Sequence, residues 1–464
     1  MFKSTLYKER RENLKKFFKH GVLLFLGNQD SPANYPSNCY KFRQDSSFLY
    51  FFGINEPCFA GLIDIDNDKE IIFGNDVDMD DIIWMGNQPT VVDRAALAGI
   101  TETYPLEELS SYLHRVQQQS KVHYLPPYRT ANCLMISEIL HINAKEVIAK
   151  RSLELINAVV ALRSTKGKEE IEELEKASYI GYKMHTAAMQ FCKLGVKEQE
   201  IAGILDGIAA SYGKMNSFET ILSQNGETLH NHYHNQIITD GRLLLTDAGA
   251  ENNMNYCSDH TRTIPTGGKF TQRQKEVYSI VLNCHDKAVE LAKPNVTYLS
   301  VHLDICKQLV EGLKGLGLMK GDTEEAVAAG AHALFMPHGL GHMMGLDVHD
   351  MEDFGQIHVG YDQETRPSNL FGTSSLRMGR RLEEGFVVTD EPGCYFIPAL
   401  IDKWRAEKMH TNFLCYDTIE TYKDFGGIRL EDDLLITSNG ARFIGEKHIP
   451  ITIEEVENYM QDYK

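Results

Sequence analysis

Two aspartates on either side of an asparagine-rich stretch are the first residues in this chain whose types and spacing could do chemistry. Asp247 ends one strand-like run and Asp259 opens another, with 251–255 between them. Such runs around a turn predict a β-hairpin. A hairpin centred on Asn253 would place the two carboxylates opposite each other, with Cβ atoms about 5 Å apart. Opposed carboxylates repel, so this arrangement needs a bound cation or a raised pKa; a solvated hairpin with both acids in water is the alternative.

Three later segments supply further candidate ligands. His338, His342 and His349 lie in a glycine-punctuated stretch that is too irregular to form one helical face. Glu391 ends a strand-like run at a Pro-Gly pair. Residues 426–436 predict another strand, with alternating apolar residues on one face and Glu431 on the polar face. A lone histidine in such a place would most often be structural. The number of potential ligands in these segments favours a site instead.

A set of five side chains combines these segments: Asp247, Asp259, His342, Glu391 and Glu431. Four negative charges are enough to hold two divalent cations that share carboxylates. Hard ligands favour Mn²⁺ and, less decisively, Co²⁺ or Zn²⁺. Two such ions about 3.5–4 Å apart would bridge a water molecule, lower its pKa, and polarise a carbonyl or phosphoryl oxygen.

The elements that must position these residues divide the chain into two predicted domains. Residues 1–164 alternate helix-like and strand-like stretches, with strands expected at 22–26, 60–66 and 70–73, which predicts a small α/β domain. Residues 165–464 predict an α+β domain in which helices cover one face of a mostly antiparallel sheet. The other face would then carry the chemistry. The helices are expected at about 169–192, 197–212, 271–293, 298–315 and 323–331.

Composition excludes several classes of function. The chain has 464 residues and a formal net charge of −18, which repels phosphate backbones and anionic lipid, so we expect neither nucleic acid nor membrane as a partner. Nine scattered cysteines without a CxxC pair argue against a disulfide framework. The apolar run at 21–27 is too short to cross a bilayer. These features predict a cytoplasmic protein.

The ordered motifs resemble a known family. Asp-Ala-Gly, Ser-Asp-His-Thr-Arg-Thr, His-Gly-Leu-Gly-His, Asp-Val-His-Asp, Glu-Pro-Gly and Gly-Ile-Arg-Leu-Glu-Asp-Asp, in this order, are similar to the proline-specific metallopeptidases of the pita-bread fold, the prolidases and aminopeptidases P. The resemblance implies a small α/β amino-terminal domain followed by a pita-bread (creatinase/methionine-aminopeptidase-like) catalytic domain. Residues 42–50 and 84–86 are similar to that amino-terminal domain, although core and loop structure would also explain them.

The resemblance also implies roles for individual residues. The five acidic and histidine side chains named above would be the dimetal ligands, with Asp259 and Glu431 bridging. The interval from Asp247 to Asp259 is one residue longer than usual, and the extra residue falls in the turn. The implied catalytic residues are His349, His230 and Glu391, and the implied substrate-binding residues are His338, Arg429 and Arg377.

Two insertions favour a prolidase over an aminopeptidase P. One lies at 395–427, and the other is the long loop 351–376, which leads to Arg377. That residue matches an arginine that in prolidases binds the free carboxylate of a dipeptide, and a guanidinium fork suits a terminal carboxylate. The alternative is a solvated arginine like its neighbours Arg380 and Arg381.

We therefore expect a dimetal exopeptidase that hydrolyses the Xaa-Pro bond of a small peptide with proline second, as an Xaa-Pro dipeptidase. The main alternative is an aminopeptidase P that removes the first residue from longer peptides. A non-catalytic pita-bread binding protein and a metal-free, creatinase-like amidine hydrolase are disfavoured, because both would be expected to lose ligands. A homodimer or higher homo-oligomer is also expected.

Overall fold

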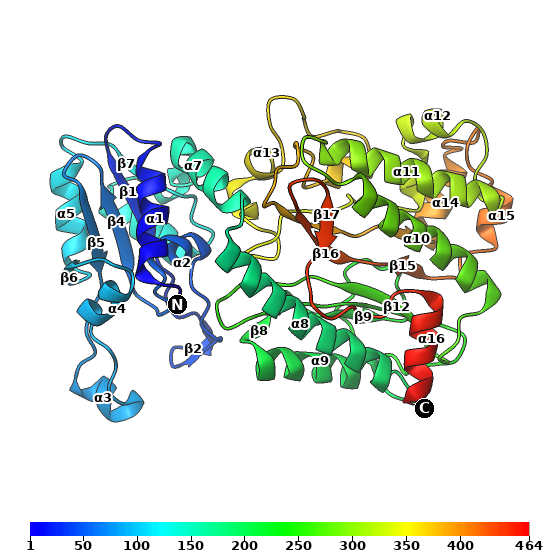
Figure 1. Cartoon of the computed structure of the whole chain (residues 1–464), viewed down its shortest axis with the longest axis horizontal. Helices are drawn as coiled ribbons and strands as arrows, with labels where there is room; N and C mark the ends of the chain where they lie inside the picture. The colour runs from blue at the N-terminus through cyan, green and yellow to red at the C-terminus, as the bar shows by residue number, and fades with distance from the viewer. Residues whose placement is uncertain (464) are drawn as a thin grey trace. The chain divides into compact units, whose positions relative to one another are not determined.

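The computed structural model describes residues 1–463, which form two compact units (Figure 1). Unit 1 contains residues 1–163 and the segment 351–358. Unit 2 contains residues 164–350 and the described chain from 359 onward. The chain therefore passes between the two units at three places, after residues 163, 350 and 358. Lys166 and Asp350 lie beside the first two of these places, and a buried ion pair joins them, with Nζ to Oδ2 at 3.2 Å.

A mixed five-stranded sheet forms the core of unit 1. Its strands are β1 (Val22–Leu26), β4 (Ala60–Asp64), β5 (Lys69–Phe73), β6 (Glu102–Tyr104) and β7 (Val122–Tyr124). The strand order is β6-β5-β4-β1-β7, with parallel pairing for β1 with β7 and for β5 with β6. β1 and β4 are apolar and buried on both faces, as is typical of strands covered on both sides. The strands expected at 22–26, 60–66 and 70–73 are confirmed.

Helices and a short hairpin complete unit 1. Asp45 caps α2 because its Oδ1 accepts a hydrogen bond from the backbone N–H of Phe48 at 2.8 Å. The elements are α1 (Ser4–Lys15), the hairpin β2 (Pro32–Tyr35) and β3 (Asn38–Cys39), α2 (Ser46–Phe52), α3 (Met79–Met85), α4 (Val91–Leu97), α5 (Glu108–Val116), α6 (Thr130–Ile139), η1 (Ala144–Glu146), α7 (Leu153–Ser164) and η3 (Glu352–Phe354).

Small antiparallel sheets form the centre of unit 2. The strands are β8 (Met215–Asn216), β9 (Ile221–Ser223), β10 (Leu243–Asp247), β11 (Ala250–Glu251), β12 (Thr261–Pro265), β13 (Val387–Asp390), β14 (Gly393–Tyr395), β15 (Gly427–Arg429), β16 (Asp432–Ile436) and β17 (Ala441–Phe443). They are ordered β12-β10-β9, β13-β16-β17, β14-β15 and β11-β8, and each pairing is antiparallel. The expected antiparallel α+β pattern is confirmed.

Long helices pack in pairs against these strands, α8 with α9 and α10 with α11 (Figure 1). Four of the five expected helices are confirmed within one or two residues at each end. The fifth, α12, is shorter and is followed by the 3₁₀ turn η2. The elements of unit 2 are α8 (Lys168–Phe191), α9 (Glu198–Tyr212), α10 (Gln272–Leu291), α11 (Tyr298–Gly315), α12 (Thr323–Ala328), η2 (Ala331–Leu334), η4 (Thr373–Ser375), α14 (Pro398–Ala406), α15 (Tyr416–Glu420) and α16 (Ile453–Asp462). The short helix α13 (Gln356–Val359) crosses the boundary, and all of its residues except Val359 belong to unit 1.

The register of the β10–β12 hairpin corrects one expectation. Asp247 pairs with Thr261, so the hairpin is centred on Met254 and not on Asn253. The cause is a tight turn, in which the backbone N–H of Asn252 donates to Tyr256 O at 2.9 Å. The positive φ of Asn255, 67°, completes this turn. Asp259 therefore lies two residues before the partner of Asp247 and is its diagonal neighbour.

The strand expected across residues 426–436 is interrupted. β15 ends at Arg429 and β16 begins at Asp432, and the two strands join different sheets. At the break, the backbone N–H of Glu431 donates to Thr261 O at 3.0 Å. The break brings Glu431 beside the strand that follows Asp259. No helix within residues 1–463 has the length and apolarity needed to cross a membrane.

Candidate metal centre

One cavity in unit 2, about 660 Å³ in volume, collects every site residue that the sequence predicts. Strands and loops supply its walls, and none of its lining residues in the described chain belongs to α8, α9, α10 or α11. The helices therefore leave this side of the strands open. The ten predicted residues that line it are His230, Asp247, Asp259, His338, His342, His349, Arg377, Glu391, Arg429 and Glu431.

The two aspartates approach each other because the chain between them is compact. Asp247 is the last residue of β10, and Asp259 precedes β12 by two residues. Between them, a Cβ added at Gly249 would lie 1.8 Å from Ser258 O, so only glycine lets the two segments come this close. The hydrogen bond from Ala248 N to His260 O, 3.0 Å long, closes the pairing.

His342 presents one ring nitrogen to the carboxylates. Its Nδ1 donates to Met343 O at 3.0 Å, so the neutral ring has its lone pair on Nε2. That Nε2 lies 3.4 Å from Asp259 Oδ2 and 3.9 Å from Glu391 Oε1. Two hydrogen bonds to Thr389 of β13 hold the backbone of His342 in place. The imidazole is thus oriented as a ligand.

The two glutamates approach from separate sheets. Glu391 follows the last residue of β13, so its side chain leaves the sheet at the strand's end. Glu431 lies at the break between β15 and β16, and its Oε2 accepts a hydrogen bond from Thr261 Oγ1 at 2.6 Å. Ligand atoms of Asp259, His342 and Glu431 all lie within 4.8 Å of one another.

Burial and mutual repulsion raise the pKa of the clustered carboxyl groups. Burial, and then the charges of Glu431 and Asp247, hold the pKa of Asp259 well above its usual range. Burial, and then Glu391 and Asp247, do the same for Glu431. Burial also raises the pKa of Glu391 to about 7, although Arg429 opposes this rise. Cations in the cluster would reverse these effects by stabilising the charged forms.

The donor set fits divalent cations. Oδ1 of Asp247 and Oδ1 of Asp259 are buried and have no hydrogen-bond partner within residues 1–463. An unsatisfied buried carboxylate oxygen is costly, and a cation removes that cost. The lone pair of His342 Nε2 faces the same carboxylates. Four carboxylates and one imidazole are ligands that suit Mn²⁺, Co²⁺ or Zn²⁺.

A hydrogen-bonded chain runs along one wall of the cavity. The NH2 group of Arg429 donates to Asp247 Oδ2 at 2.6 Å, and its NH1 group donates to the Tyr395 hydroxyl at 2.9 Å. That hydroxyl donates to His338 Nε2 at 2.9 Å, and His338 Nδ1 donates to Gly339 O at 2.8 Å. Burial, and then the charge of Arg429, lower the pKa of His338 to about 3, so the ring is neutral. These hydrogen bonds hold the side chains of Arg429 and His338 in place.

Three other predicted residues line the cavity but are not members of this hydrogen-bonded chain. His349 packs edge-on against the ligand His342, with ring centroids 4.2 Å apart. Burial, and then Arg429, lower the pKa of His230, which keeps a neutral ring. Arg377 lines the same cavity. Its neighbours Arg380 and Arg381 form ion pairs with Glu383 and Glu364.

A buried network supports the ligands from behind. Asp432, next to Glu431, accepts hydrogen bonds from Arg262 NH2 at 2.9 Å, from His260 Nδ1 at 3.1 Å and from His285 Nε2 at 3.1 Å. Burial alone would lower the pKa of His285. Hydrogen bonds to Asp286 and Asp432 outweigh burial and raise it to about 9.

Sequence reasoning missed Tyr395 as a functional residue. Its hydroxyl joins Arg429 to His338, and its ring lies so close to Gly393 that a Cβ there would be 2.5 Å from the hydroxyl oxygen. A glycine two residues before an aromatic residue in one strand was the available signal, because both side chains share a face. Apolar residues Phe218, Ile221 and Leu229 also line the cavity.

Two sequence families match this chain. Residues 172–438, more than half of the chain, match the family described as Metallopeptidase family M24. Residues 7–124 match the family described as Aminopeptidase P, N-terminal domain. The first match lies in unit 2 except for residues 351–358, and the second lies in unit 1.

Individual relatives carry two different names. A Fusarium vanettenii protein named "Probable Xaa-Pro aminopeptidase" is 31% identical over 90% of this chain and 86% of its own. The human protein named Xaa-Pro dipeptidase is 29% identical over 95% of this chain and 88% of its own. A solved structure of an Escherichia coli aminopeptidase P variant with substrate has a TM-score of 0.82 at 28% identity, covering 100% of this chain and 99% of that chain. Zinc-substituted Escherichia coli aminopeptidase P with product also has a TM-score of 0.82.

Proposed function

Because this chain belongs to metallopeptidase family M24, we propose that it is an exopeptidase that hydrolyses the peptide bond between a first residue and a proline. The observation that carries this proposal is that five ligand side chains, two of them with unpartnered buried oxygens, converge on a cavity that also contains an arginine. Relatives named Xaa-Pro aminopeptidase and Xaa-Pro dipeptidase support the choice of bond.

We propose that two divalent cations, Mn²⁺ in the first place, are held by Asp247, Asp259, His342, Glu391 and Glu431. The unpartnered Oδ1 atoms of both aspartates and the lone pair of His342 Nε2 support this assignment. When bound, such ions activate water and polarise the carbonyl that is attacked. Co²⁺ and Zn²⁺ suit the same ligands.

The other cavity residues would handle the charge and the proton. The His349 imidazole would donate a hydrogen bond to the carbonyl oxygen as negative charge develops there, and His230 would assist in binding the substrate. The Glu391 carboxylate would carry a proton to the prolyl nitrogen, the leaving group. The hydrogen bonds that join Arg429 to His338 through Tyr395 would keep this wall of the cavity rigid.

We propose that Arg377 makes the enzyme prefer dipeptides to longer peptides. A dipeptide has a carboxylate directly after its prolyl ring, and a longer peptide has no charge at that point. The place of Arg377 in the cavity wall supports a role in binding that carboxylate. This favours an Xaa-Pro dipeptidase. The likeness to aminopeptidase P structures over the whole chain favours the second candidate, an Xaa-Pro aminopeptidase.

The test compares kcat/KM for Ala-Pro with kcat/KM for Ala-Pro-Ala, in the metal-loaded enzyme. A charge-assisted pair contributes about 1.5–3 kcal/mol, so Arg377→Ala should lower the ratio roughly 10- to 100-fold. Arg366→Ala, which replaces an exposed arginine on the same long loop, is the matched control. An unmodified enzyme that prefers the tripeptide would favour the aminopeptidase. No activity on either peptide would refute the proposal as a whole.

The cytoplasmic location and the homo-oligomeric state stay predictions. Sedimentation of the purified protein tests the second: a single species of 52.6 kDa would show a monomer.

A further inference from the structure

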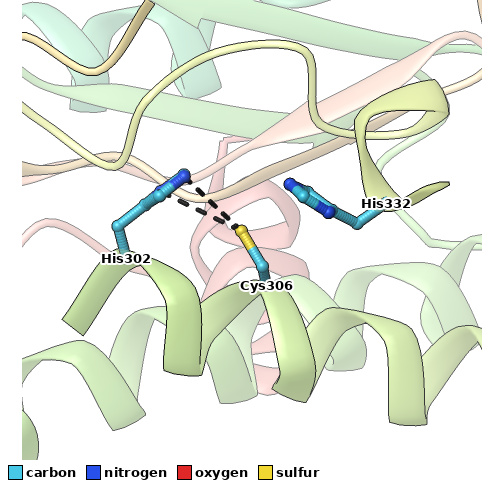
Figure 2. A group of neighbouring side chains, drawn as sticks. All are labelled: His302, Cys306 and His332. Atoms are coloured by element: carbon cyan, nitrogen blue, oxygen red, sulfur yellow. Dashed lines mark hydrogen bonds between the residues drawn. The ribbon is translucent and has the colours of Figure 1, made fainter. Parts of the chain in front are cut away.

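Three potential metal ligands converge away from the cavity, on helix α11 and the turn η2 (Figure 2). His302 and Cys306 are four residues apart on α11 and so lie on the same face of the helix. His332 comes from η2, which packs against α11. All three side chains are 0% exposed. Within the described chain, none of the three lines the cavity that holds the five carboxylate and imidazole ligands.

The polar atoms of this cluster are poorly satisfied. Both ring nitrogens of His332 are buried and have no hydrogen-bond partner among the described residues. His302 Nε2 faces Cys306 Sγ at 3.6 Å, a weak interaction because a thiol is a poor donor. Leaving such buried groups unpaired is costly, and native proteins do so rarely. A ligand that accepts lone pairs from nitrogen and sulfur would remove this cost.

The spacing of the three donors suits one ion. Nitrogen and sulfur that bind the same ion at roughly 2.0–2.3 Å lie about 3.5 Å apart. His302 Nε2 and Cys306 Sγ are already at this separation, and one ligand atom of His332 lies within 4.8 Å of both. Figure 2 shows the His332 ring turned toward the sulfur from the opposite side to His302. A small rotation of the His332 side chain would bring its ring nitrogen close enough to bind the same ion as the other two ligands.

We propose that His302, Cys306 and His332 form a second kind of metal site in this chain, and that it binds the soft monovalent cation Cu⁺. Thiolate and imidazole are ligands that select Cu⁺, and three ligands complete its coordination without water. This site lies outside the centre assigned to hydrolysis and does not depend on the proposed function.

The net charge of the occupied site favours Cu⁺ over a divalent ion. Besides burial, the groups that act on the two rings are histidines: His332 and then His338 act on His302, and His410 acts on His332. Within the described chain, none of these influences comes from a carboxylate. On binding, the Cys306 S–H bond breaks, its proton leaves to solvent, and sulfur bonds to the ion. Cu⁺ with one thiolate is neutral, whereas Zn²⁺ would leave a buried positive charge, which is costly.

Both rings are ready to act as ligands. Burial lowers the pKa of His302 to about 3 and that of His332 to about 4, so each ring is neutral and offers a lone pair. Burial raises the pKa of the Cys306 thiol, so the sulfur stays protonated until a cation arrives.

The experiment expresses the full chain in copper-supplemented medium, so that the ion is present as the site folds. The protein is purified without oxygen, dialysed against a weak Cu⁺ chelator and analysed for copper. We expect about one copper per chain, and at least about tenfold less in Cys306→Ser and His332→Leu. Cys192→Ser, which alters a buried thiol on another helix, should keep its copper. Copper should also raise the unfolding temperature of the unmodified chain but not of the Cys306 variant.

Three outcomes would overturn the proposal. Equal copper in the unmodified chain and in Cys306→Ser would place the ion elsewhere. Retention of Zn²⁺ but not Cu⁺ at these residues would refute the choice of a monovalent ion. If either variant fails to fold, X-ray absorption of the copper-loaded unmodified chain decides the matter, because only one sulfur and two nitrogen neighbours agree with the proposal.

Discussion

The free energy of unfolding of unit 2 should depend on pH partly through His285. Replacing His285 with glutamine should remove most of that contribution. In the folded chain, His285 Nε2 donates to Asp432 Oδ2 at 3.1 Å, and the ring stacks on Phe443 with centroids 4.9 Å apart. Burial opposes the charged ring, but Asp286 and Asp432 outweigh burial and raise its pKa to about 9. Glutamine keeps a side-chain donor and does not titrate. The loss of the ring's stacking on Phe443 does not itself depend on pH, so the difference in pH dependence between the two proteins reports the His285 proton equilibrium.

The direction and size of the effect follow from the two pKa values. An unfolded histidine has a pKa of about 6.5, so both states are protonated below that pH and the stabilisation is fully present. It is lost as pH rises from about 6.5 through about 9, where the folded ring loses its proton. At about 1.4 kcal/mol per pKa unit, the unmodified chain should lose about 3 kcal/mol relative to the variant over this range.

Tryptophan fluorescence can follow this change in unit 2 alone. The chain has two tryptophans: Trp404 of α14 is 4% exposed, and Trp84 of α3 is 85% exposed. Unfolding therefore changes mainly the surroundings of Trp404. Urea titrations of metal-saturated protein from about pH 6 to about pH 10 would give the free energy of unfolding at each pH.

Subtracting the pH profile of His285→Gln from that of the unmodified chain isolates the titration of His285. Cysteines, tyrosines and lysines that titrate at alkaline pH are common to both proteins, so they cancel in the difference. His114→Gln, which alters an exposed histidine on α5, should follow the unmodified chain. Parallel pH profiles for the unmodified chain and His285→Gln would refute the reasoning, because they would show that His285 does not keep its proton through the ion pair with Asp432.

Three further predictions concern the cavity. His349→Ala should keep its divalent ions yet lose roughly 10²–10³ in turnover, since the imidazole acts mainly in the transition state; loss of bound metal by elemental analysis would contradict this role. Asp259→Ala should lower bound manganese from about two ions per chain, and an unchanged count would contradict its assignment as a ligand. Gly249→Ala should destabilise unit 2 by about 3 kcal/mol or more, because the new Cβ would lie 1.8 Å from Ser258 O. An unchanged urea midpoint would show that this segment can move aside.

The convergence of the site residues could be predicted from sequence because each one is attached to a strong local signal. Glu391 follows an apolar strand and precedes Pro-Gly, so its place at a strand end was fixed by neighbours in the chain. The long helices were predicted within one or two residues for the same reason: their apolar periodicity runs over many turns.

Details that depend on distant partners could not be predicted. The hairpin register shifted by one residue because the turn closes on Asn252 and Tyr256, and sequence alone does not show which asparagine adopts a positive φ. The alternation across 426–436 looks like one strand, yet Glu431 pairs with Thr261 of another sheet and breaks it. Tyr395 gains its role only through residues distant in the sequence, His338 from a loop and Arg429 from β15.

The three places where the chain passes between the units limit how this protein can be divided or recombined. Residues 351–358 belong to unit 1, where Met351 and Phe354 are buried, yet they are encoded inside the sequence of unit 2. A fragment that begins at residue 164 would carry these apolar side chains without the unit that covers them. Exchange of one unit between homologous genes therefore needs junctions at three sites, and the first two must leave Lys166 and Asp350 in the same parental segment to keep their ion pair.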